Sequence, residues 1–129
     1  MSSAEGAYAP GACNIGAAEI RLRWIAGYAG SAATVIVWIA LAWGGLSAAW
    51  YAVLALPAML AATGFIQAQA RFCVHFGLRH MFNFDDVGSA TDVEDAAARR
   101  LDRRRAWQIV GMSAAIAAVV AMVGVMTAL

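Results

Sequence analysis

Three long apolar segments alternate with short polar segments along this chain. Residues 25–43, 48–68 and 107–128 contain no Asp, Glu, Lys or Arg. A helix of about 20 apolar residues, rising 1.5 Å per residue, crosses a hydrocarbon core of about 30 Å. The pattern therefore predicts an all-α integral membrane protein with three transmembrane helices. The short connection at 44–47 leaves room only for a tight turn, so we expect an antiparallel hairpin followed by a third span.

The polar segments complete a single predicted membrane domain over residues 1–129. Residues 1–12 lack periodicity, which is typical of a flexible tail. Residues 13–24 are expected to form an interfacial segment with a short helix capped by Asn14. Residues 71–106 are expected to form a cytoplasmic segment that carries an amphipathic, charged helix.

Two local patterns refine the 71–106 segment. Gly77 is expected to break or bend the helix that leaves the second span, because glycine weakens helix interiors. Thr91 and Glu94 have the spacing of a capping box and predict the start of a second helix. This second helix is expected to continue without a break into the third span.

Small residues at helical spacing predict close packing between the spans. Gly27 with Ser31 and Gly30 with Thr34 form such pairs in the first span, and Gly111 with Ala115 forms one in the third. Small residues four positions apart let helix backbones approach closely in membranes.

Composition agrees with the membrane assignment. The chain is 63% hydrophobic and 13% charged, whereas about a quarter of the residues of a soluble domain are charged. The two cysteines are too few for a disulfide framework. No basic residue and no long apolar run precede Arg21, so a cleaved signal peptide is not expected.

The arginines predict how the chain is oriented in its membrane. All nine basic residues are arginines, and none lies in the turn at 44–47 or after the third span. Under the positive-inside rule the N-terminus is cytoplasmic and the C-terminus lies outside. One cluster is expected to contact anionic lipid headgroups: Arg99, Arg100, Arg103, Arg104 and Arg105. Nucleic-acid binding is not expected, because nearby acidic residues dilute the charge of this cluster.

Several motifs occur in a familiar order: CNIGAAEIR at 13–21, PAMLAATGFIQAQARFC at 57–73, FNF at 82–84 and DRRRA at 102–106. Together they resemble a group of small bacterial inner-membrane proteins with two or three helices. The chain is more distantly similar to the YgaP-type membrane domain, which is sometimes fused to a rhodanese. The resemblance implies a multi-pass protein of the bacterial inner membrane, and it implies no established activity.

Cys13 and Cys73 form the candidate thiol site. Both are expected on the cytoplasmic side, one before the first span and one after the second, where the hairpin brings the two ends together. We expect the two cysteines to approach each other closely enough for mild oxidation to crosslink them. A functional thiol needs an accessible, electropositive setting, whereas two packed apolar cysteines need none. The residues that would support a thiol site are Asn14, Glu19, Arg21, Arg71, His75 and His80.

Two functions stay open at this point. The first is a non-enzymatic accessory or interaction subunit, because the chain is short and contains no recognisable catalytic motif. The second is a thiol, redox or sulfur-handling protein that uses Cys13 and Cys73. The spacing of Cys73, His75 and His80 matches no usual zinc pattern, so neither a metal nor a cofactor is predicted. The expected partners are the lipid bilayer and either another protein or further copies of this chain.

Overall fold

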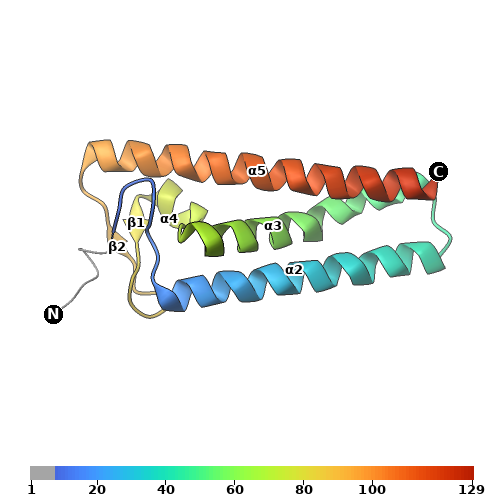
Figure 1. Cartoon of the computed structure of the whole chain (residues 1–129), viewed down its shortest axis with the longest axis horizontal. Helices are drawn as coiled ribbons and strands as arrows, with labels where there is room; N and C mark the ends of the chain where they lie inside the picture. Colours follow the sequence, from blue (N-terminus) through green and yellow to red (C-terminus); the bar gives the residue numbers. More distant parts are fainter. Residues whose placement is uncertain (1–7) are drawn as a thin grey trace.

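The computed structural model describes residues 8–129, which form mostly long helices (Figure 1). Helix α2 spans Ala17–Trp43, α3 spans Ala55–Ala70 and α5 spans Ala96–Ala128. A 3-10 helix, η1 at Ala48–Leu54, leads directly into α3. α2, α5 and the continuous unit from η1 to α3 are each long and apolar enough to cross a membrane. The expected all-α architecture with three such helices is confirmed.

Helix α3 lies between α2 and α5 and packs against both (Figure 1). The contact between α2 and α3 is close because both helices present glycine. A Cβ atom on Gly64 would lie 2.5 Å from the backbone nitrogen of Gly27, and one on Gly30 would lie 2.4 Å from that of Ala61. Gly45 makes the turn between the first two helices with a φ of +63°, a conformation that glycine adopts without steric cost.

The polar elements gather at one end of the bundle, opposite the C-terminus (Figure 1). Helix α4 spans Val74–Arg79, and the short strands β1 (Met81–Phe82) and β2 (Thr91–Asp92) pair antiparallel. Ile15 forms a parallel bridge with Asn83, which joins the segment before α2 to the end of β1. We call residues 8–24 and 71–105 the arginine end, because they contain every arginine of the chain.

The expectation of a separate interfacial helix before the first span is wrong. Helix α2 begins at Ala17 and continues unbroken to Trp43. No glycine or proline lies between residues 17 and 24 to interrupt the helix. Asn14 does not cap α2 either, because Gly16 occupies the capping position and makes no side-chain cap.

The predicted flexible tail at 1–12 falls partly outside the described residues, which start at Tyr8. Its described part is held in place. The Tyr8 hydroxyl and the Gly11 backbone N–H both donate to the carboxylate of Asp102 on α5. The Tyr8 ring also stacks on Phe82, with ring centroids 4.9 Å apart. Residues 8–12 are therefore anchored. The sequence pattern does not predict this, because Asp102 and Phe82 are distant from these residues in the chain.

Two predicted helix boundaries in the 71–106 segment are also wrong. Helix α5 begins at Ala96 with Asp95 as its cap, whose side chain accepts from the backbone N–H of Ala98 at 2.9 Å. Thr91 is instead in β2. Gly77 lies inside α4, which ends at Arg79 and is followed by His80 in a left-handed conformation with φ of +60°. The expected continuity of the charged helix with the third span is confirmed, since α5 runs without a break.

Candidate functional site

The candidate site is built around Asn14, which is fully buried at the arginine end. Its side-chain oxygen accepts from the backbone N–H of Cys73 at 2.7 Å, and its amide nitrogen donates to the Cys73 carbonyl at 3.2 Å. The Asn14 backbone donates to the Arg71 carbonyl and accepts from the Asn83 N–H. A buried backbone group without a partner is costly. Asn14 supplies hydrogen-bond partners to the backbone groups of Arg71 and Cys73, which lie in the irregular link between α3 and α4.

A line of polar side chains runs from Asn83 to the sulfur of Cys73. Asn83 donates to Glu19 at 3.2 Å, and Glu19 forms an ion pair with Arg23 at 3.0 Å. The second terminal nitrogen of Arg23 donates to the Cys73 sulfur at 2.9 Å. Glu19 and Arg23 lie one helical turn apart on α2, and Glu19 is only 2% exposed, so this ion pair is buried.

The line from Asn83 to Cys73 has the chemistry of a structural junction. Its carboxylate and guanidinium neutralise each other, and each amide is hydrogen-bonded. The Cys73 residue is 2% exposed, so a substrate cannot reach its sulfur in this conformation. In the part of the chain that the structure describes, no group of three or more His, Cys, Asp or Glu residues is arranged to hold a metal ion.

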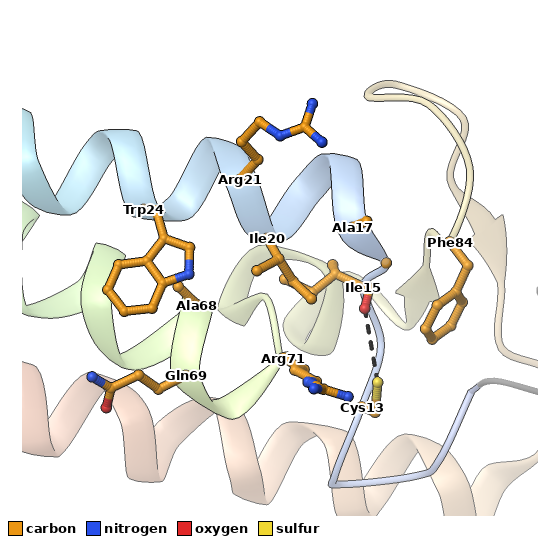
Figure 2. Close-up of a pocket in the computed structure, with 11 residues that line it drawn as sticks. Cys13, Ile15, Ala17, Ile20, Arg21, Trp24, Ala68, Gln69, Arg71 and Phe84 are labelled. Atoms are coloured by element: carbon orange, nitrogen blue, oxygen red, sulfur yellow. Dashed lines mark hydrogen bonds between the residues drawn. The ribbon is translucent and has the colours of Figure 1, made fainter.

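Cys13 lies in a different environment, on an open groove of about 850 Å³ between the start of α2 and the end of α3 (Figure 2). Its thiol is half-buried and donates to the Ile15 carbonyl at 3.7 Å. Arg21 and Arg71 also line this groove, as does Phe84. Figure 2 shows the Arg71 side chain directed along the groove toward Cys13, whereas Arg21 points outward from α2.

The two cysteines are both free thiols. Cys13 is the neighbour in sequence of Asn14, which binds the Cys73 backbone. The two sulfurs nevertheless contact different partners. The Cys73 sulfur contacts Arg23, and the Cys13 sulfur contacts the Ile15 carbonyl. The oxidative crosslink between them stays a prediction.

The two histidines are not part of the network around Asn14. His75 is exposed on α4. His80 caps the C-terminal end of α4 while Cys73 caps its N-terminal end, so the helix separates them. The His80 ring lies 3.4 Å from a terminal nitrogen of Arg103. Among the other arginines of α5, Arg99 donates to the Val93 carbonyl, and Arg100 and Arg104 are exposed.

Four residues that matter here were missed by the sequence analysis. They are Tyr8, Arg23, Asn83 and Asp102. The contact of Arg23 with the Cys73 sulfur could be inferred only once α2 is known to begin at Ala17, which places Arg23 one helical turn after Glu19. Asn83 lies within the FNF motif, and Asp102 lies within DRRRA. The buried Asp102 accepts from Tyr8, and burial together with this hydrogen bond raises the pKa of the tyrosine above its ordinary value.

Comparisons of the chain with models of protein families, with curated proteins and with solved structures find no significant match. The resemblance to small bacterial inner-membrane proteins therefore stays a prediction.

Proposed function

We propose that this chain is a small non-enzymatic subunit of the bacterial inner membrane, which acts by binding a transmembrane helix of another protein. The observation that supports this most is the openness of the bundle. Both α2 and α5 pack against α3, yet they make no extended contact with each other among residues 8–129. A groove of about 460 Å³ remains between them, with α3 as its floor.

The lining of this intramembrane groove suits a helix with small or apolar side chains. Its floor contains three alanines of α3, which are Ala58, Ala61 and Ala62. Its two hydroxyls, on Ser31 and Thr34, already donate to the carbonyls of Gly27 and Gly30 at 2.9 and 2.8 Å. The two hydroxyls therefore need no further polar partner, and small residues on the floor favour close helix packing.

Site-specific photo-crosslinking in intact membranes tests this proposal. A photoreactive amino acid is placed at Val35 on one wall of the groove and, separately, at Ile116 on the other wall. The matched control positions are Ile36 on α2 and Ala118 on α5, which are exposed but lie outside the groove lining. We expect the same partner protein, identified by mass spectrometry, from both walls and from neither control. Lipid adducts alone, or equal protein crosslinks at all four positions, would contradict the proposal.

A second candidate function is thiol chemistry at the arginine end, and the contact between Arg23 and Cys73 is the observation that favours it. Reactive cysteines use cationic neighbours, but they also need access. Variants with a single cysteine separate the two requirements. We expect Cys13 in a Cys73→Ser variant to react readily with a maleimide, and Cys73 in a Cys13→Ser variant to react slowly. Fast labelling of Cys73, or a Cys13–Cys73 crosslink on mild oxidation, would favour the thiol function.

A further inference from the structure

The groove at the arginine end combines features that belong to a binding site for an amphiphile. It lies where α2 and α3 leave the apolar part of the bundle. One end is formed by Trp24, Ile20 and Ala68, with the exposed Gln69 at its edge, and the other end by Arg71, Cys13 and Phe84 (Figure 2). An occupant that fits this arrangement is apolar toward the bundle and anionic toward the arginine end.

Arg71 is the residue that gives the groove its charge. Its side chain makes no ion pair or hydrogen bond with the residues that the structure describes, in contrast to Arg23, which is paired with Glu19. A guanidinium carries five N–H donors and matches phosphate oxygens with two parallel hydrogen bonds. Arg71 therefore offers a complete set of donors to an occupant of the groove.

The backbone of Arg71 has a conformation that is strained for any residue other than glycine. Arg71 ends α3 in the left-handed conformation, with φ of +55°. Glycine is the usual residue at such a helix end, because any side chain is strained there. The Arg71 conformation is held by hydrogen bonds from the Asn14 N–H to the Arg71 carbonyl and from the Phe72 N–H to the Gln67 carbonyl. Strain of this kind at a non-glycine residue points to a role for its side chain.

We propose that this groove binds one anionic phospholipid, whose phosphate is held by Arg71 and whose acyl chain lies over Ile20 and Ala68 beside Trp24. Arg21 lies at the rim of the groove and points outward from α2, so Arg71 is the guanidinium directed along the groove (Figure 2). The choice of a lipid rests on the polarity gradient of the groove and on its position at the end of the apolar helices. The choice of an anionic headgroup rests on the unpaired guanidinium. This proposal is independent of the partner-binding groove between α2 and α5.

The test uses the full chain with Cys73→Ser, in detergent, so that alkylation of Cys13 reports occupancy of the groove. The probes are dioleoyl-phosphatidylglycerol, dioleoyl-phosphatidylcholine and inorganic phosphate. We expect phosphatidylglycerol to slow alkylation and the other two to leave it unchanged. Native mass spectrometry should detect one retained phosphatidylglycerol. Equal protection by phosphatidylcholine or by inorganic phosphate would overturn the proposal.

Arg71→Gly separates binding from folding, because glycine adopts the left-handed conformation without strain. We expect this variant to keep or raise its unfolding temperature and to bind phosphatidylglycerol about tenfold or more weakly, as loss of a charge-assisted hydrogen bond implies. Arg79→Gln removes the same charge from an exposed site on α4 that lies outside the groove and outside the arginine cluster of α5. Wild-type affinity in Arg71→Gly, or an equal loss in both variants, would overturn the proposal.

Discussion

Asn14 connects three segments at the arginine end with one side chain and one peptide unit. It binds both backbone groups of Cys73, and its own backbone binds Arg71 and Asn83. Asn14, Cys73 and Asn83 are all almost completely buried, so water does not reach the groups of these three residues. The stability of the arginine end therefore depends strongly on the side-chain amide of Asn14.

The first prediction concerns Asn14→Ala, which leaves the N–H of Cys73 without a partner and removes one of the two donors to its carbonyl, the other being the Gly77 N–H. An unsatisfied buried polar group costs about 1–3 kcal/mol, so we expect the free energy of unfolding in detergent to fall by about 2 kcal/mol or more. Ser89→Ala, at an exposed loop position, is the control and should change little. Equal stability of the two variants would show that the Asn14 contacts do not support the fold.

The second prediction concerns Tyr8, whose pKa is raised by burial first and by the hydrogen bond to Asp102 second. Because the pKa is higher in the folded state than in the unfolded state, the stabilisation is fully present below the unfolded value of about 10 and is lost as pH rises above it. We expect Tyr8→Phe to lose this part of the pH dependence. Thermal unfolding at about pH 8 and about pH 11 measures it.

The comparison for Tyr8 is the difference between wild type and variant at each pH, since other groups also titrate in alkali. The two proteins should differ most at the lower pH and converge at the higher one. A difference that is independent of pH would mean that the Tyr8 hydroxyl does not donate to Asp102 in the folded protein.

At the scale of elements, glycine determines which helix faces are in close contact. Gly64 on α3 faces backbone atoms of α2, namely the nitrogen of Gly27 and the carbonyl of Arg23, at 2.5 and 2.8 Å from a Cβ position. Gly111 on α5 has open space around it instead. The sequence predicted close packing at Gly27 and at Gly111 alike, and the structure places only Gly27 in a helix contact within the chain.

The third prediction uses these two glycines as a matched pair. Gly64→Ala pushes α2 and α3 apart, and overpacking of this kind costs about 1–3 kcal/mol. Gly111→Ala adds a methyl group in open space and gains helix propensity, so it should be neutral or stabilising. Unfolding in detergent measures both variants. Equal effects of the two substitutions would contradict the α2–α3 packing described above.

The elements themselves were predictable because their cause is local. A run of about 20 apolar residues without charge forms a helix wherever it meets a membrane, and the three helices follow these runs. The helix starts were less predictable, since Asn14 and Thr91 have the chemistry of caps but are engaged elsewhere. Asn14 binds Cys73, which is 59 positions away, and no local pattern reports such a contact.

At the scale of the whole molecule, the long helices position a polar junction at one end and leave a groove along their length. The presence of Cys13, Cys73, Glu19 and Arg71 at this end was predictable from the topology of a hairpin. The sequence did not predict that Cys73 would lie in a buried network while Cys13 lies on an open groove. This difference depends on the direction of the chain between residues 8 and 16, which is set by distant contacts with Asp102, Arg71 and Asn83.

The positive-inside rule predicts that the three long helices span a membrane with the arginine end in the cytoplasm. The turn after α2 and the loop between β1 and β2 lie at opposite ends of the bundle (Figure 1). The first contains Ser47 and the second contains Ser89, and both residues are exposed. We propose Ser47→Cys and Ser89→Cys, each in a cysteine-free background, probed in intact cells with a membrane-impermeant maleimide. The account predicts labelling at position 47 in intact cells and at position 89 only after the membrane is opened. Labelling of both positions from the same side would contradict it.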